Sequence, residues 1–329
     1  MRKTLITLSI GIAGLLGGCS GTHETAIGIP SVVSPAARAN VPPAARGPWI
    51  GEAPMPTARY WLGVGMVNGI LYAVGGVNGG YLSTVEAYDP ATNTWTPKAS
   101  MPTPRGFLAV GVVRGILYAI GGSNSGGNLS TVEAYDPATD TWSTKASMPT
   151  PRSSLAVGVV NNVLYAVGGY TGGPINAVEA YDPSTNSWST KASMPTMRDS
   201  LAVCGVKGIL YAVGGDGVGQ IELGTVEAYD PATDSWTTMA SMPTARTGLA
   251  GDVVGGRLYA IGGYSSVPPH NVIGKVEAYD PATNAWSTKS PMPTRRGYLA
   301  VGVVNRTLYA VGGINHGGHI INTVEAFPR

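Results

Sequence analysis

Residues 101–142 carry the pattern that decides the fold: Met101-Pro102-Thr103-Pro104-Arg105, Ile116-Leu117-Tyr118-Ala119-Ile120-Gly121-Gly122, Val132-Glu133-Ala134-Tyr135-Asp136-Pro137 and Trp142. The arginine, the Gly-Gly pair and Val-Glu-Ala recur in this order six times after residue 48, and Tyr-Asp-Pro with the tryptophan follows them in five of the copies. The Gly-Gly pairs lie 46 to 50 residues apart, and a period of this length is typical of a protein built from structural repeats. The pairs are Gly75-Gly76, Gly121-Gly122, Gly168-Gly169, Gly214-Gly215, Gly262-Gly263 and Gly312-Gly313.

Each repeat predicts a small sheet of four antiparallel strands, named A to D here in chain order. In the quoted copy, residues 108–113 form the A strand and residues 116–120 the B strand, with a tight turn between them. The C strand lies at 132–135, Asp136-Pro137-Ala138-Thr139 supplies turn-forming residues, and the D strand begins at Trp142. One such sheet cannot bury both of its faces, so we expect the six sheets to cover one another radially.

The order of arginine, Gly-Gly, tyrosine and tryptophan in each copy resembles the repeat of the kelch family. The resemblance covers residues 49–329 and includes every copy. It implies an all-β fold, a six-bladed propeller with four antiparallel strands per blade.

The last repeat predicts how the ring closes. Its A strand is expected from Arg296, its B strand up to Gly313 and its C strand at 324–327, and no D strand follows. The segment 49–57 aligns with the D strands of the other copies, with Trp49 in the place of their tryptophan. We therefore expect the N-terminal strand to complete the sixth blade.

The N-terminus predicts export. Met1-Arg2-Lys3 precedes an apolar stretch too short for an ordinary membrane-spanning helix, which is typical of a signal peptide at 1–18. The next residues, Leu16-Gly17-Gly18-Cys19, resemble a bacterial lipobox, in which Cys19 is acylated; the alternative is an ordinary signal peptide with an incidental cysteine. Ser20 after the cysteine favours the outer membrane or cell surface, with a periplasmic position as the other option.

Residues 19–48 are rich in alanine and proline and predict a linker between this lipid anchor and the propeller at 49–329. Without Arg2 and Lys3 the chain has 19 basic and 19 acidic side chains, so we expect no attraction to nucleic acid. Cys204 is the only other cysteine, which excludes an intrachain disulfide once Cys19 is acylated. We expect a monomer.

One side of the predicted ring varies among the repeats. The A–B and C–D turns are nearly uniform, whereas the B–C loops range from 77–84 in the first blade to 264–275 in the fifth. These loops and the D–A links open on the same side, which we call the mouth face. Variable loops on a rigid scaffold favour ligand binding there.

Two charged positions are present in every repeat, an arginine before each A strand and a glutamate in each C strand. They are either paired with one another to hold the strands, as buried charges normally are, or the arginines form a ring that gathers an anion. Arg59, Arg105 and Arg296 accordingly stay among the candidate ligand contacts. The positions are Arg59, Arg105, Arg152, Arg198, Arg246 and Arg296, with Glu86, Glu133, Glu179, Glu227, Glu277 and Glu325.

The position two residues after each arginine differs between blades. It predicts an aromatic arc of Tyr298, Trp61 and Phe107 near the mouth, extended by Tyr60. The opposite arc is polar, with Ser154, Asp199 and Ser200. The aromatic side chains either stack on sugar rings or anchor a protein ligand, or they plug the inner rim of the ring.

Six residues after each arginine, four blades have glycine, which suits a crowded inner strand. The exceptions are Cys204, expected to be a small buried substitute, and Asp252. The Asp252 carboxylate either faces a water-filled axial channel or acts as a catalytic acid or base.

Three histidines, His270, His316 and His319, lie in neighbouring B–C loops and are weak candidates for a metal site. They have no carboxylate at ligand spacing, so we expect solvated loop residues, with neither metal nor cofactor. The expected function is a lipid-anchored extracytoplasmic scaffold that recognises a carbohydrate or protein ligand on the mouth face. The alternative implied by the family resemblance is a sialic-acid mutarotase, an N-acetylneuraminate epimerase, with Asp252 as acid or base.

Overall fold

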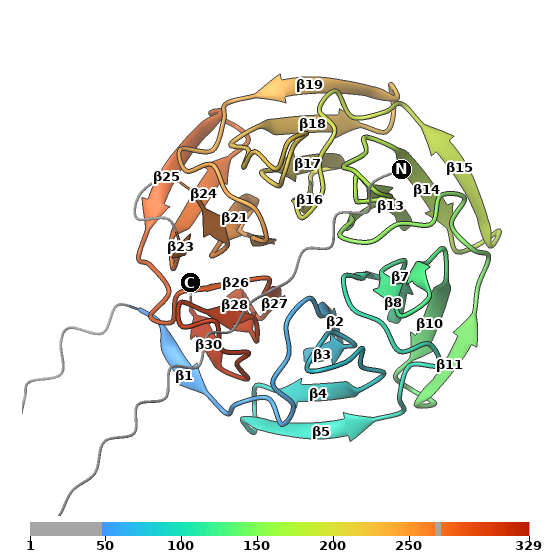
Figure 1. Ribbon diagram of the computed structural model, residues 1–329, viewed down its shortest axis with the longest axis vertical. Coiled ribbons are helices and arrows are strands. Elements are labelled where there is room, and N and C mark those ends of the chain that lie inside the picture. The colour runs from blue at the N-terminus through green and yellow to red at the C-terminus, as the bar shows by residue number, and fades with distance from the viewer. Residues whose placement is uncertain (1–47, 267–270, 329) are drawn as a thin grey trace, which may run out of the picture. The chain divides into compact units, whose positions relative to one another are not determined.

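The structure is a computed structural model that describes residues 48–266 and 271–328. The predicted signal peptide, Cys19, nearly all of the linker and His270 lie outside the described residues. The described residues form six four-stranded antiparallel sheets arranged around one axis (Figure 1). The predicted six-bladed, all-β propeller is therefore confirmed.

Each blade has its A strand at the axis and its D strand at the outer wall. The A strands are β2 (Gly63–Val67), β6 (Ala109–Val113), β12 (Ala156–Val160), β16 (Ala202–Val206), β20 (Ala250–Val254) and β27 (Ala300–Val304). The B strands are β3 (Ile70–Val74), β7 (Ile116–Ile120), β13 (Val163–Val167), β17 (Ile209–Val213), β21 (Arg257–Ile261) and β28 (Thr307–Val311).

The outer half of each blade consists of the C and D strands. The C strands are β4 (Val85–Asp89), β10 (Val132–Asp136), β14 (Val178–Asp182), β18 (Val226–Asp230), β24 (Val276–Asp280) and β30 (Val324–Phe327). The D strands are β5 (Thr94–Lys98), β11 (Thr141–Thr144), β15 (Ser187–Lys191), β19 (Ser235–Met239), β25 (Ala285–Lys289) and β1 (Ile50–Glu52).

The B and C strands are buried on both faces because a neighbouring blade covers each side. Strand β7, with the sequence Ile-Leu-Tyr-Ala-Ile, has four of its five residues buried, whereas the outer strand β11 is largely exposed. Six apolar clusters form the core, and each draws its residues from two adjacent blades. The propeller core is thus a set of interfaces between sheets, which explains why β-branched and aromatic residues dominate these strands.

The D-strand tryptophan of each blade makes a hydrogen bond to the preceding blade. The Trp95 indole N–H donates to the carbonyl oxygen of Ala53 at 2.9 Å, and Trp142 donates to Ala99 at the same distance. A carboxamide or carboxylate oxygen from the C–D turn makes a second link: Asn93 accepts the N–H of Ala53 at 2.8 Å. The corresponding turn residues of the next four blades are Asp140, Asn186, Asp234 and Asn284.

The N-terminal strand completes the sixth blade, as predicted. Strand β1 pairs antiparallel with β30, with Ile50 opposite Ala326 and Glu52 opposite Val324. Trp49 stacks on Phe327 at 4.9 Å between ring centroids and donates its indole N–H to the Ser290 carbonyl at 3.0 Å. Trp49 therefore makes the same hydrogen bond between blades as the five D-strand tryptophans, from a segment at the other end of the propeller domain.

The A strands begin later than expected. The predicted A strand from Leu108 begins at Ala109, and the one expected from Arg296 is divided into β26 (Arg296–Gly297) and β27. A residue with positive φ causes both differences, Phe107 at 57° and Tyr298 at 55°, because a left-handed residue interrupts an extended strand. Strand β26 instead pairs with β29 (Ile314–Asn315).

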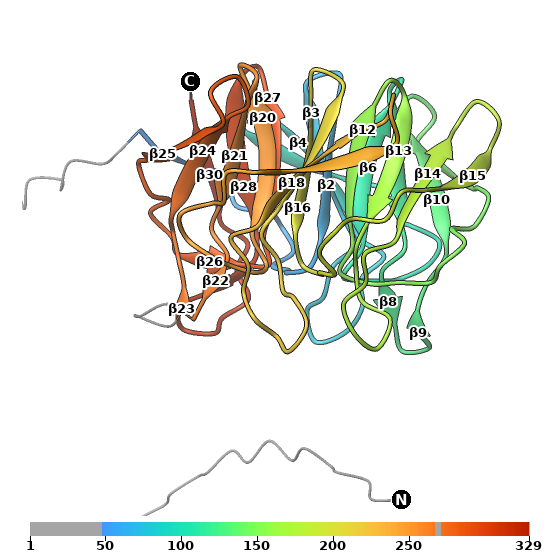
Figure 2. The same ribbon diagram turned by 90° about the horizontal axis from the view of Figure 1, so that it is seen from above.

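The two faces of the ring differ as the repeats predict. The B–C loops and D–A links lie together on the mouth face, where the short hairpins β8 (Ser123–Asn124) with β9 (Gly127–Asn128), and β22 (Tyr264–Ser265) with β23 (Asn271–Val272), project (Figure 2). The A–B and C–D turns lie on the opposite side. No helix able to cross a bilayer is found within residues 48–266 and 271–328.

Candidate ligand-binding site

The mouth of the propeller is framed by one left-handed residue from each D–A link. All six occupy the position two residues after the repeat arginine, and their φ angles fall between 52° and 58°. Five of them carry a side chain, which makes this conformation unusual. They are Trp61, Phe107, Ser154, Ser200, Gly248 and Tyr298.

These six residues form a closed belt of backbone hydrogen bonds around the axis. The N–H of each donates to the carbonyl of its counterpart in the preceding blade, for example Phe107 to Trp61 at 2.9 Å. The belt closes where Trp61 donates to Tyr298 at 3.0 Å. The left-handed conformation points each of these N–H groups toward the preceding blade, where it finds a carbonyl acceptor. We call these six residues the mouth belt.

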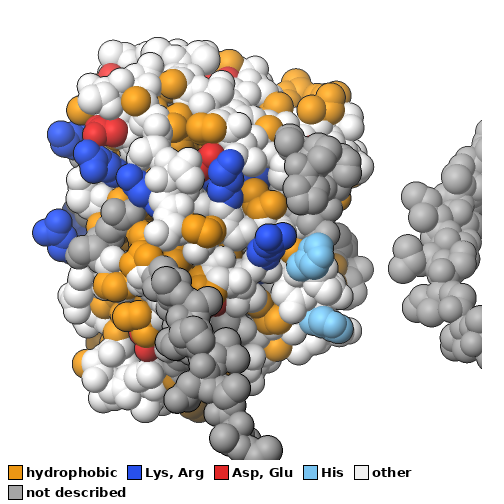
Figure 3. All heavy atoms as spheres, turned by 90° about the vertical axis from the view of Figure 1, so that its left-hand side faces the viewer, with side chains coloured by type: hydrophobic (Ala, Val, Ile, Leu, Met, Phe, Trp, Pro, Cys, Tyr) orange, Lys and Arg blue, Asp and Glu red, His pale blue; other side chains and the backbone are white. Residues whose placement is uncertain are grey.

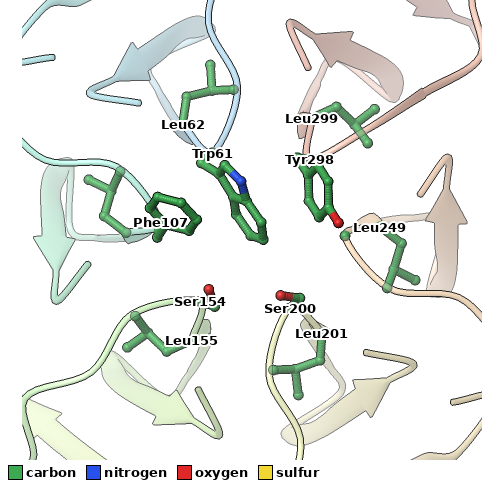
Figure 4. Close-up of a pocket in the computed structure, with 12 residues that line it drawn as sticks. Trp61, Leu62, Phe107, Ser154, Leu155, Ser200, Leu201, Leu249, Tyr298 and Leu299 are labelled. Carbon is green, nitrogen blue, oxygen red and sulfur yellow. The ribbon is translucent and has the colours of Figure 1, made fainter. Parts of the chain in front are cut away.

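The mouth belt encloses a cavity of about 100 Å³. The leucine that follows each belt residue also lines the cavity, but its side chain points outward from the belt, away from the opening (Figure 4). The leucines are Leu62, Leu108, Leu155, Leu201, Leu249 and Leu299.

The predicted aromatic arc is present and packs on itself. Trp61 lies between Phe107 and Tyr298, with ring centroids 4.4 Å and 4.2 Å away and interplanar angles of 29° and 24° (Figure 4). The Tyr298 ring in turn lies against Gly248, where an added Cβ would come within 2.3 Å of its Cε1 atom. Neither face of Trp61 is therefore free to stack on a sugar ring, and the arc presents its edges to the opening.

The polar half of the rim is also found where it was predicted. Ser154 and Ser200 lie across the opening from Trp61 (Figure 4), and the Ser200 hydroxyl donates to Asp199 at 2.7 Å. Tyr60 and Asp199, however, do not line the cavity. They belong to a second tier in which each residue pairs with the start of its own B–C loop, Tyr60 with Val77 and Asp199 with Asp216.

The repeat arginines are structural. The Arg59 guanidinium is fully buried and donates to Glu86 at 2.6 Å and to the Thr84 carbonyl at 2.8 Å, while its Nε lies 3.2 Å from the Met55 sulfur. The Thr57 hydroxyl donates to the second oxygen of Glu86 at 2.8 Å. The same ion pair recurs in the other blades as Arg105–Glu133, Arg152–Glu179, Arg198–Glu227, Arg246–Glu277 and Arg296–Glu325.

The expectation that Arg59, Arg105 and Arg296 contact a ligand is therefore wrong. Each is 0% exposed, and each is neutralised by the glutamate of its own blade. Burial lowers the pKa of Arg59 to about 10, opposed by the Glu86 carboxylate, so the side chain stays charged at neutral pH. The arginines hold the D–A link onto the B and C strands and contribute no free positive charge to the mouth.

The mouth face is instead acidic between blades four and five. Asp199 pairs through its backbone with Asp216, and Asp216 with Glu222 in the same B–C loop. Burial raises the pKa of both aspartates, and the neighbouring carboxylates raise that of Asp216 further. Burial raises the pKa of Tyr298 to about 12, with further contributions from Asp216, Tyr264, Asp199 and Glu222.

Most of the exposed large apolar side chains lie on the same face, on blades one, three, four and five. Of the eight large hydrophobic residues that are exposed among the described residues, six lie on B–C loops or D–A links, and Ile50 and Met66 lie elsewhere. Sequence comparison of the repeats did not find these six, because five of them occur in the B–C loops, where the copies no longer align, and Met197 occupies a position of the D–A link that varies among the copies. They are Tyr81, Tyr170, Met197, Val218, Ile221 and Tyr264.

Asp252 lies deeper along the axis, three residues beyond Leu249 on β20, or roughly 10 Å along an extended strand. Its carboxylate accepts the N–H of Val253 at 2.7 Å and a hydrogen bond from the backbone of Val303 on β27. Burial raises its pKa to about 6. The side chain is only partly exposed and joins the inner strands of blades five and six.

Two further expectations concern the cysteine and the histidines. Cys204 is buried at 5% exposure, as expected of a small substitute for glycine, and burial raises the pKa of its thiol. His316 and His319 are exposed, and are pale blue on the surface in Figure 3. No group of three or more metal-ligating side chains occurs within the described ranges, and His270 falls outside them.

Comparison with known proteins supports the repeat assignment. Residues 46–194 match the family model described as the KLHDC2/KLHL20/DRC7 Kelch-repeats domain, and residues 197–243, 245–293 and 295–327 match the Kelch motif. A solved structure titled "Structure of YjhT" is similar with a TM-score of 0.72 and 18% identity, over 82% of this chain and 95% of that chain. At this identity the likeness concerns the fold alone. No curated protein matches the chain.

Proposed function

The chain belongs to the kelch-repeat family, and we propose that its propeller is an extracytoplasmic scaffold that docks a protein ligand on the mouth face. The observation that carries the proposal is that six of the eight exposed large hydrophobic side chains among the described residues lie on that face. Exposed apolar groups on a rigid scaffold mark interaction surfaces, and aromatic residues such as Tyr81 and Tyr170 are enriched in them.

A protein ligand fits the mouth better than a sugar does. The cavity of about 100 Å³ is smaller than the roughly 300–1,000 Å³ of typical small-molecule sites, so it suits one inserted side chain. Trp61 is enclosed between two rings and offers no free face for a sugar. The surrounding loops supply the larger contact area that a protein interface needs.

Site-specific photocrosslinking in cells that make the protein tests this proposal. A photoreactive phenylalanine analogue replaces Tyr170 on the mouth face or, as the matched control, Met66, which is 40% exposed on β2. We expect one discrete, protease-sensitive adduct from position 170 and none from position 66. No adduct, or the same adducts from both positions, would overturn the proposal.

The second candidate is a sugar isomerase, favoured by the pKa of about 6 at Asp252, close to the value that a general acid or base needs near neutral pH. Proton NMR of anomer exchange in N-acetylneuraminate would test it. Catalysed exchange that disappears in Asp252→Asn would support the isomerase. Exchange at the uncatalysed rate with the unmodified chain would exclude it.

We also propose that Cys19 anchors the propeller to a membrane, on the strength of the Leu16-Gly17-Gly18-Cys19 segment. Metabolic labelling with an alkyne fatty acid should tag the wild-type chain and not Cys19→Ser, and the variant should leave the membrane fraction. Cys204 is the only other thiol, so Cys204→Ser serves as the control and should keep the label. Labelling that persists in Cys19→Ser would reject the anchor.

A further inference from the structure

The B–C loop of blade four is the most apolar part of the mouth face. Val218 and Ile221 are 67% and 62% exposed, more than any other exposed large hydrophobic residue among those described. Met197, on the link that enters the same blade, is 48% exposed. A loop that holds two aliphatic side chains in water at this exposure gains free energy when a partner covers them.

Three carboxylates accompany these apolar residues. Asp199 and Asp216 exchange backbone hydrogen bonds of 3.0 Å and 2.8 Å, and Asp216 also pairs with Glu222, so the three side chains come from adjacent segments. Their hydrogen-bond donors include hydroxyl groups: Ser200 donates to Asp199 and Ser266 to Glu222. None of the ion pairs among the described residues involves any of the three.

The negative charge of these three carboxylates is therefore not neutralised by any ion pair within the described part of the chain. Asp199 and Asp216 are partly buried, which raises the pKa of both, and the Asp199 and Glu222 carboxylates raise the pKa of Asp216 further. The nearest repeat arginines, Arg198 and Arg246, cannot offset them because each is buried and paired with its own glutamate. A cation from outside would relieve this repulsion.

We propose that this surface, formed by Val218, Ile221, Asp199, Asp216 and Glu222, docks a basic and apolar segment of the protein ligand. A lysine or arginine of that segment lies against the three carboxylates, and a neighbouring apolar side chain covers the two aliphatic residues. The inference rests on the proposed function and adds the chemistry of the partner to it. A ligand carrying negative charge is disfavoured at the same place.

The test uses the full-length chain and three fluorescent peptides, read by anisotropy. The peptides share leucine and tryptophan and differ only at two central positions, which hold lysine, glutamine or glutamate. We expect the lysine peptide to bind at least about tenfold more tightly than the glutamate peptide, because opposite charges attract and like charges repel at a partly desolvated interface. The difference should shrink at high salt, which screens exposed charges.

Variants locate the effect. Asp216→Asn combined with Glu222→Gln should remove most of the preference for lysine, and Val218→Ser combined with Ile221→Ser should weaken all peptides that bind. Asp230→Asn is the matched control on the opposite side of blade four. It removes one negative charge but keeps a side-chain oxygen for the Ala232 amide, so binding should not change.

Equal binding of all three peptides, or a preference for glutamate, would overturn the inference. So would a lysine preference that survives in the Asp216→Asn, Glu222→Gln variant. No binding of any peptide would also overturn it. In each of these cases the crosslink from position 170 decides the proposed function separately, since it does not depend on the charge of the partner.

Discussion

The left-handed conformation of the mouth-belt residues allows the hydrogen bonds that hold the six blades together. A non-glycine residue in this region costs roughly 1–2 kcal/mol, yet five of the six mouth-belt positions carry a side chain. The hydrogen bonds between blades offset that cost at every position. Blade five has Gly248 instead, and the space that a side chain would fill is taken by the Tyr298 ring.

Replacing Gly248 by alanine should therefore destabilise the ring more than its conformation alone requires. The added Cβ would lie 2.3 Å from Tyr298 Cε1 and would displace that ring from Trp61, in addition to the left-handed cost of roughly 1–2 kcal/mol. Urea denaturation followed by tryptophan fluorescence measures the loss. Ser154→Gly, at the same belt position, is the control and should change stability by less than about 1 kcal/mol. Equal effects of the two variants would contradict this account.

Asp252 should make stability depend on pH. Its folded-state pKa of about 6 lies above the unfolded value near 3.9, so the native state binds the proton more tightly, and this residue's contribution to stability falls as pH rises from about 4 to about 6. A carboxamide at this position cannot ionise, so Asp252→Asn should gain stability relative to wild type at pH 7.5, by an amount of order 1–3 kcal/mol. Urea midpoints of both proteins at pH 4.5 and 7.5 measure this difference. A difference between the two proteins that does not change with pH would show that the carboxylate is not desolvated.

At the scale of the element, the C–D turn links each blade to the blade that precedes it in the ring. Asp140 adopts φ of 54° and accepts both the Tyr135 hydroxyl at 2.6 Å and the Ala99 amide of the preceding blade at 2.9 Å. Asn93 and Asn186 do the same in other blades with a carboxamide oxygen. The turn therefore needs a residue that accepts two hydrogen bonds and tolerates a left-handed backbone. A negative charge on that residue is not required.

Asp140→Ala should cost about 1–3 kcal/mol, because two donors at the blade interface lose their acceptor. Asp140→Asn should be nearly neutral, since asparagine occupies this turn position in three other blades. Thermal melts of the two variants provide the comparison. If asparagine destabilises as much as alanine, the charge of Asp140 rather than its geometry holds the turn.

The repeat pattern predicted the elements well because it is a pattern of burial and turn chemistry, which local sequence records. It located the B strand before the Gly-Gly pair in every copy and the Asp-Pro turn in five of the six, and it identified Trp49 as the missing tryptophan. It placed the start of the A strand one residue early at Leu108, because nothing in Phe107 itself indicates positive φ. Gly248 at the same position was the available signal.

The candidate site was predictable in part. The comparison of equivalent positions placed Trp61, Phe107 and Tyr298 together at the mouth, which the structure confirms. It left open whether the arginines were buried, since that depends on the packing of the B and C strands around each guanidinium. It also missed the rim residues Val218 and Ile221, because exposure of a loop side chain is a property of the folded surface and has no repeat to compare against.

For the whole molecule, closure by β1 makes one interface unlike the other five. Five junctions have two links, a tryptophan N–H to a carbonyl and a turn oxygen to an amide. At the junction of blades five and six, the described residues show the Trp49–Ser290 bond and no C–D turn, because β30 and β1 are not consecutive in the chain. The ring should therefore open first at this junction.

Removing residues 49–57 should destabilise the whole ring, because it deletes β1 and also Met55 and Thr57, which hold the Arg59–Glu86 pair. Trp49→Phe isolates the junction itself: it keeps an aromatic ring against Phe327 and loses one hydrogen bond, worth about 1 kcal/mol.

The matched variant is Trp188→Phe, which loses the equivalent bond to Ala146 at a junction that keeps the Asn186 link. If closure limits opening, Trp49→Phe should accelerate hydrogen exchange across β1 and β30, whereas Trp188→Phe should leave β14 and β15 largely protected. Equal acceleration at the two junctions would mean that the ring has no preferred point of opening. An unchanged melt after deletion of 49–57 would mean that β1 does not close the ring at all.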